Sequence, residues 1–268
     1  PMTPTAVLMT SVLGALQNAT VANVGLSGYG PRQELVALKR YALSLQPKTV
    51  VWVFYEGNDL EDVQIYDAAI PNAGEFVQTH WERSFTRNAL WAILRVAEHR
   101  ECTPKTELAQ HYGTALDAKG KPQQIYFMES GLPLSSNELD ALNKTGTVLE
   151  EAYRLCRERG IRFVVVFAPK EYRVYEGLSN FVDASEEVKR WTVNDLPERL
   201  RAIVGNISAD IDYVDLTPIF KANAEHGMPV FLPDDMHWAP QGHRMAAEAL
   251  HRLLSSPHVP HDQTAHSP

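Results

Sequence analysis

TVVWVFYEGND, residues 49–59, contains the pattern that decides the fold. Its first seven residues form a continuous apolar run, rich in β-branched and aromatic side chains, as in strands that are buried on both faces of a sheet. The run ends abruptly in the polar EGND, which is typical of a turn. The sequence therefore predicts a buried parallel strand over residues 49–55, followed by a turn.

Helical and strand-like segments alternate on both sides of this strand. Apolar residues recur at helical spacing over residues 4–18, 31–47, 137–159, 185–205 and 240–254. Further strand-like runs lie at residues 21–25, 162–168 and 212–216. This alternation predicts an α/β protein in which a parallel sheet lies between two layers of helices. Because the chain opens on a helix, we expect the first strand of the sheet to be missing.

Two segments interrupt the alternation. Residues 61–136 contain one helical stretch, at about 84–99, among polar and Gly/Pro-containing segments. They are too long for an ordinary connection and predict an insertion placed to cover a site. Residues 255–268 are rich in Pro, Ser and His, without periodicity, and predict a disordered tail. Residues 1–254 are expected to form a single domain that includes the insertion.

The composition indicates a folded, acidic protein. Its 268 residues are 44% hydrophobic, enough to fill a sizeable core. A net charge of −8 argues against a nucleic-acid partner, because binding to a phosphate backbone needs clustered Lys and Arg. No run approaches the roughly 18 apolar residues of a membrane span. Cys102 and Cys156 do not make a disulfide framework, and we expect two separate buried thiols.

Three polar loops are candidates for a site, since ligands of a doubly wound sheet bind beyond the carboxyl ends of its strands. LSGYG, residues 26–30, does not match the dinucleotide-binding glycine pattern, and Tyr29 excludes a nucleophile elbow centred on Ser27. The LSGYG segment is either a tight turn, or a loop in which the backbone N–H of Gly28 is free to donate a hydrogen bond to an oxyanion. In EGND, Asn58 is either a turn residue or a second donor into the same space.

DDMHW, residues 234–238, is the strongest candidate of the three loops. A histidine with a carboxylate two or three residues earlier can be held in one tautomer and act as a general base. A metal site of Asp234, Asp235, His237 and His243 is disfavoured, because no paired-histidine spacing is present. The alternative without function is a helix-capping aspartate beside a surface histidine.

NVGLSGYG, EGNDL and DDMHWAPQGH, in this order, resemble blocks two, three and five of the SGNH (GDSL) hydrolase superfamily. PKTVVWVFYEGNDL, FAPKEYRVY and DDMHW are most similar to bacterial SGNH proteins of the alginate O-acetyltransferase-like group. The resemblance covers residues 5–60 and 160–254. It implies a three-layer α/β/α sandwich with a flavodoxin-like sheet, a serine nucleophile, a His–Asp pair and an oxyanion hole.

The resemblance assigns the oxyanion hole to Gly28 and Asn58 and the general base to His237. The acid is Asp234 by the common D-x-x-H spacing, or Asp235 by the D-x-H-W form of the acetyltransferase-like group, which we slightly favour.

Three further residues are candidates for substrate binding. Lys170 and Arg173 follow the strand at residues 162–168 together with Tyr172, although a solvated loop is an equally good interpretation. Trp238 could line the pocket, although tryptophan more often packs in a core.

The family's first block, Gly-Asp-Ser at the end of the first strand, has no counterpart in this chain. Ser11 falls in a helical pattern and Ser27 in the oxyanion loop, so neither replaces it. We therefore expect the nucleophile upstream of Pro1. A chain that begins with proline is expected to belong to a longer protein, whose start could carry a signal peptide or membrane anchor.

The expected function is that of a serine esterase or O-acyltransferase that acts, without a cofactor, on a small-molecule or polysaccharide ester. Polysaccharide chemistry would place it outside the cytoplasm. The alternative is a catalytically inactive carbohydrate-binding or scaffold module with the same fold. A third option is an α/β-hydrolase that uses Ser27.

Overall fold

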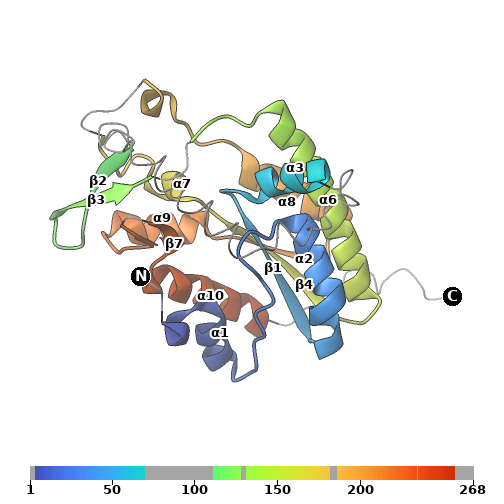
Figure 1. Ribbon diagram of the computed structural model, residues 1–268. Coiled ribbons are helices and arrows are strands. Elements are labelled where there is room, and N and C mark those ends of the chain that lie inside the picture. Colours follow the sequence, from blue (N-terminus) through green and yellow to red (C-terminus); the bar gives the residue numbers. More distant parts are fainter. Residues whose placement is uncertain (1–3, 70–110, 128–130, 182–185, 234, 257–268) are drawn as a thin grey trace, which may run out of the picture.

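The computed structural model describes residues 4–69, 111–127, 131–181, 186–233 and 235–256 (Figure 1). Its central sheet is parallel, with strands β1 (Thr49–Tyr55), β4 (Arg162–Ala168) and β5 (Asp212–Asp215) in the order β1-β4-β5. The bounds of β1 and β4 confirm the two predicted strands; β4 is buried along nearly its whole length, whereas in β1 only Trp52 and Phe54 are buried. Every residue of β1 has a partner in β4, from Thr49 opposite Arg162 to Tyr55 opposite Ala168.

Helices cover both faces of the sheet, which confirms the α/β/α sandwich. One layer contains α2 (Pro31–Ala37), α3 (Asp59–Ala69), α6 (Ser136–Arg157) and α8 (Leu196–Ile207). The other contains α1 (Met9–Gln17), α9 (Thr217–Glu225) and α10 (Pro240–Ser255), and the two layers lie on opposite sides of β1 and β4 in Figure 1. Alternate residues of β4 point into the two cores. The core beneath α2, α3, α6 and α8 contains Phe163, Val165 and Phe167, and the core beneath α1, α9 and α10 contains Val164 and Val166.

Local signals explain where several helices begin. The Ser135 hydroxyl accepts a hydrogen bond from Glu138 N–H, and the Glu138 carboxylate accepts one from Ser135 N–H, which caps α6. The helix predicted over residues 185–205 is divided into η5 (Val188–Arg190) and α8. Pro197 lies in the first turn of α8, where backbone N–H groups have no partner within the helix, so its missing N–H costs nothing. In a continuous helix over 185–205, the proline ring would clash with the preceding turn.

Other predicted helices also differ in detail. Residues 4–18 form the short η1 (Thr5–Val7) and then α1. Residues 31–47 form α2, a π-helical turn η2 (Leu38–Ala42) and the 3₁₀ turn η3 (Leu43–Leu45) in succession.

The predicted strand at residues 21–25 is wrong, because these residues form no regular structure and Ala22, Asn23 and Gly25 are exposed. A strand is stable only beside a partner. Among the described residues, β1 pairs with β4 alone and no strand lies along its other edge. Residues 21–25 therefore have the apolar pattern of a strand, but no described strand lies beside them to pair with.

The expected insertion is described only in part. Its first residues continue α3, whose Leu60 and Val63 are buried in the core. Its later part contains an antiparallel hairpin, β2 (Tyr112–Leu116) and β3 (Pro122–Tyr126). The predicted helix at 84–99, Cys102 and all but the start of the predicted tail lie outside the described residues. Within the described part of the chain, no helix is both long and apolar enough to span a membrane.

Candidate active site

The segment that contains His237 is a strand, not the predicted loop. Strand β7 (Asp235–Trp238) pairs with β6 (Phe231–Leu232) in a short antiparallel hairpin that leads into α10. Residues two apart on a strand point to the same face. The Asp235 carboxylate accordingly contacts His237 Nδ1 and also accepts a hydrogen bond from His237 N–H, at 3.0 Å.

This pair has the arrangement of a general base and its orienting acid. Partial burial alone would raise the pKa of Asp235, but the hydrogen bonds from His237 outweigh it and hold that pKa below its ordinary value. An ionised Asp235 fixes the proton of His237 on Nδ1 and leaves Nε2 as an acceptor. No described residue hydrogen-bonds to Nε2, and the side chain is 70% exposed, so a reacting hydroxyl can reach it.

Two neighbours of His237 have structural contacts. The Trp238 ring packs edge-on against Phe220, with centroids 5.2 Å apart, and against His243, at 5.5 Å. Burial, and then the nearby His237, lowers the pKa of His243. Trp238 therefore contributes to the core beside the hairpin. Asp234, the alternative acid, lies outside the described residues.

Gly28 lies in a turn that only glycine adopts without strain. Tyr29 N–H donates to the Leu26 carbonyl at 3.0 Å, and Gly28 has a φ of 79°. The turn leads into α2, whose first N–H groups are accepted by the Gly30 carbonyl. Gly28 itself is exposed. Its backbone can therefore be approached from solvent.

Asn58 connects β1 to α3, and its amide Nδ2 donates to Asp62 at 2.9 Å. The turn that holds it is fixed by Asp59, whose carboxylate accepts from Tyr55 N–H at 2.9 Å. A side chain at Gly30 would collide with Asp62. The Gly28–Gly30 turn and the Asn58 turn therefore meet at the start of α3.

The comparison with known families identifies a match over residues 118–267, more than half of the chain. The matching family is described as the SGNH hydrolase-like domain of acetyltransferase AlgX. The chain belongs to this family. No match was found among curated proteins or among solved structures.

The matched range of the AlgX family contains β4, the β6–β7 hairpin and the Asp235–His237 pair, and it excludes Gly28 and Asn58. Membership confirms the suspected SGNH fold and an enzyme family of the esterase or acyltransferase type. The assignment of Gly28 and Asn58 to the oxyanion hole stays a prediction.

The AlgX-family domain has a buried ion pair that the sequence did not reveal. The Glu56 carboxylate, at the end of β1, accepts from Arg173 Nε at 2.8 Å and from Arg173 Nη2 at 2.7 Å. It also accepts from Lys170 N–H at 3.1 Å, and Arg173 donates further to Asn194. The pair joins the carboxyl ends of β1 and β4, because Arg173 lies on α7 (Glu171–Tyr175), directly after β4.

These contacts define where the candidate substrate-binding residues lie. The Arg173 side chain is only 5% exposed and is occupied by Glu56 and Asn194. Lys170 is half-buried at the start of α7, and the Tyr172 hydroxyl donates to the Trp191 carbonyl at 3.1 Å. Arg173 therefore stabilises the ends of the strands, and contact of Lys170 with substrate stays a prediction.

The structure brings the predicted residues together in two groups. Asp235 contacts His237, and Asp62 connects Asn58 to the Gly28–Gly30 turn. Among the described residues, no hydrogen bond or ion pair joins one group to the other. In the same part of the chain, no three His, Cys, Asp or Glu side chains are arranged to hold a metal ion.

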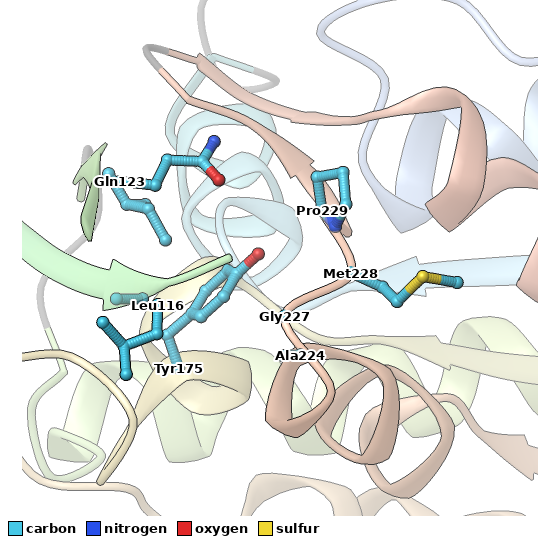
Figure 2. Close-up of a pocket in the computed structure, with 9 residues that line it drawn as sticks. Leu116, Gln123, Tyr175, Ala224, Gly227, Met228 and Pro229 are labelled. Atoms are coloured by element: carbon cyan, nitrogen blue, oxygen red, sulfur yellow. The ribbon is translucent and has the colours of Figure 1, made fainter. Parts of the chain in front are cut away.

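A small pocket, which no residue of either group lines, lies between the β2–β3 hairpin and the segment before β6 (Figure 2). Figure 2 shows Tyr175 between the hairpin side chains Leu116 and Gln123 and the Met228–Pro229 segment. The volume of this pocket is about 10 Å³, which holds about one water molecule. The pocket is therefore too small for an ester substrate.

Proposed function

We propose that this domain is a serine esterase or O-acyltransferase that moves ester-linked acyl groups, such as acetyl, to water or to a sugar hydroxyl. The observation that carries the proposal is the contact between the Asp235 carboxylate and His237 Nδ1, with Nε2 exposed. An imidazole held in this way can remove a proton from a hydroxyl nucleophile. Membership in the AlgX family supports this reaction class over other uses of a histidine.

In the proposed reaction, a serine Oγ attacks the carbonyl carbon of the ester while His237 Nε2 takes the serine proton. Gly28 N–H and the Asn58 amide donate to the oxyanion that forms. The carbon–oxygen bond to the alcohol then breaks, and the alcohol leaves with the proton from His237. Water or a sugar hydroxyl attacks the acyl-serine, His237 takes its proton, and the released serine recovers that proton.

We also propose that the serine lies upstream of Pro1, on a strand that pairs with the open edge of β1. Two observations support this placement. No described strand covers that edge, and residues 21–25, with a strand-like sequence, have no strand beside them. Within the chain, Ser11 belongs to α1 and Ser27 to the turn at Gly28.

Hydrolysis of 4-nitrophenyl acetate by two forms of the protein tests the proposal. The chain as printed should be nearly inactive, and a form extended upstream through a Gly-Asp-Ser strand should be active. In the extended form, His237→Ala should lower kcat by about 10³-fold or more, whereas Ser27→Ala should have no effect.

Equal activity in the two forms would refute the upstream serine, and an active His237→Ala variant would remove His237 from the mechanism. A folded, extended protein without activity would favour a carbohydrate-binding module.

A further inference from the structure

Asp62 contacts Asn58 of the predicted oxyanion hole and also Gly30, two residues after Gly28, although it lies outside the motifs that carry the family resemblance. Its carboxylate accepts from Asn58 Nδ2 at 2.9 Å, and its Cβ atom lies where a side chain at Gly30 would be. Gly30 is two residues after Gly28, and Asn58 is four residues before Asp62. One residue in the first turn of α3 therefore touches two segments that lie far apart in the sequence.

The bond to Asp62 determines how the Asn58 amide is oriented. An ionised carboxylate only accepts hydrogen bonds, so it must face the NH₂ end of the amide and not the carbonyl end. One N–H is then used by Asp62, and the second N–H is left to donate elsewhere. Without a carboxylate at this place, the amide could turn its carbonyl toward the site, which would repel an oxyanion.

Gly30 brings the second donor segment against the same residue. Because Gly30 has no Cβ, the backbone of the Gly28–Gly30 turn packs directly on Asp62 Cβ. The packing of the Gly28–Gly30 turn against the Asn58 turn therefore depends on Asp62.

Asp62 has no stabilising cation that would explain its presence. Burial, and then the neighbouring Glu61, raises its pKa, which shows that the folded protein disfavours its charge. Among the described residues it forms no ion pair, whereas Asp67, five residues further along α3, pairs with both Arg32 and Lys144. The helix N-terminus and the hydrogen bond from Asn58 compensate the charge of Asp62 in part.

We propose that Asp62 is a positioning residue that orients the Asn58 amide and fixes it against the Gly28–Gly30 turn, so that both donors reach one oxyanion. This inference rests on the proposed esterase or acyltransferase function. Asp62 itself is not expected to touch the substrate.

The first test needs no catalysis. In ¹H–¹⁵N spectra of the chain, the Asn58 side-chain NH₂ should give two well-separated proton signals, one of which shifts as Asp62 is titrated. Asp62→Ala should reduce the separation of the two signals to that of a solvent-exposed amide, and Asp62→Asn, whose amide oxygen can still accept, should keep the larger separation. The matched control is Glu61→Ala, since Glu61 is an exposed acid on the same turn. Asn58 signals that are unchanged in Asp62→Ala would overturn the proposal.

The second test uses the active, extended form. Asp62→Ala should lower kcat about 10- to 100-fold with little change in KM, less than the ~10²- to 10³-fold expected when an oxyanion donor is lost. Asp62→Asn should recover most of the activity, and Glu61→Ala should retain all of it. Gly30→Ala, which pushes the turn away from Asp62, should reproduce the loss in kcat.

The two proposals fail in different ways. If Asn58→Ala abolishes activity but Asp62→Ala does not, the positioning role is wrong and the esterase function stands. If Asp62 controls the Asn58 signals but Asn58→Ala and His237→Ala are fully active, the contact is structural and the proposed catalytic roles of Asn58 and His237 are wrong.

Discussion

The Glu56–Arg173 pair and the Asp235–His237 pair both join a carboxylate to a nitrogen donor near the predicted site, but they have opposite surroundings. The side chains of Arg173 and Glu56 are 5% and 2% exposed, and Glu56 also accepts from Lys170 N–H. The side chains of His237 and Asp235 are 70% and 36% exposed. The first pair is enclosed by protein, and the second faces solvent.

The difference shows what each pair can do. A buried ion pair is tolerated only when hydrogen bonds satisfy it, and removal of one partner leaves a costly buried charge. An exposed pair contributes little to stability, because solvent screens it. The exposure that makes Asp235–His237 weak as a stabilising contact also allows His237 to meet a substrate. The two pairs should therefore separate in experiments that measure stability and activity independently.

Arg173→Met should give the largest loss of stability, because it leaves Glu56 buried without a cation. We expect the free energy of unfolding to fall by about 3–5 kcal/mol, measured by urea denaturation. Arg199→Met is the control, since Arg199 forms an exposed pair with Asp195, and it should have little effect on the free energy of unfolding because solvent screens this pair. Equal losses in the two variants would contradict the structural role of Arg173. Adding Glu56→Gln to Arg173→Met should recover part of the loss.

Asp59→Asn should change how stability depends on pH. Asp59 is 3% exposed and forms no ion pair among the described residues. Burial raises its pKa well above the ordinary value; the hydrogen bond from Tyr55 N–H lowers it, and the Asp62 charge raises it further. The folded protein then binds the proton more tightly than the unfolded chain does. The free energy of unfolding should therefore fall as the pH rises from the unfolded pKa through the folded pKa.

In Asp59→Asn the group stays neutral, and the oxygen of the substituted amide can still accept from Tyr55 N–H, so this decline should be smaller than in the unmodified protein. Urea denaturation at a series of pH values measures it. Glu225→Gln, which replaces an exposed acid, should keep the full decline. A variant with the same pH profile as the unmodified protein would show that Asp59 does not hold its proton on folding.

Continuous apolar runs made part of the fold predictable. The apolar runs at 49–55 and 162–168 predict strands of a parallel sheet, and both form strands with the predicted bounds, although β1 is at the edge of the described sheet. The run at 21–25 has a similar pattern but no described partner beside it, and it is not a strand. A pattern shows which faces are apolar, whereas pairing depends on residues elsewhere in the chain.

The site was predictable where neighbours in sequence are also neighbours in space. Asp235 and His237 are two residues apart, so a strand places them together, although the four-residue β7 was too short to predict. Glu56 and Arg173 are 117 residues apart, and nothing in either segment indicates the other. The same holds for Gly30 and Asp62, which meet only because α3 packs on the turn.

Asp235→Ala should cause a much smaller loss of stability than Arg173→Met, but a large loss of activity. The pKa of Asp235 is lowered, so its contribution to stability is present above the unfolded pKa and is lost as the pH falls through the folded pKa. Because both side chains are exposed, we expect that contribution to stay below about 1 kcal/mol. In the extended form, kcat should fall by about 10³- to 10⁴-fold, since the His237 tautomer is no longer fixed.

Asp234→Ala is the matched control for Asp235→Ala, because the D-x-x-H spacing makes Asp234 the competing acid. Strand β7 places Asp235 and His237 on one face, so Asp234→Ala should keep nearly full activity. If Asp234→Ala loses activity and Asp235→Ala does not, Asp234 orients His237 during the reaction. The contact of Asp235 with His237 would then belong only to the protein without substrate. Equal losses in both variants would mean that the hairpin positions His237 as a unit, and His237 would then depend on β7 more than on either carboxylate.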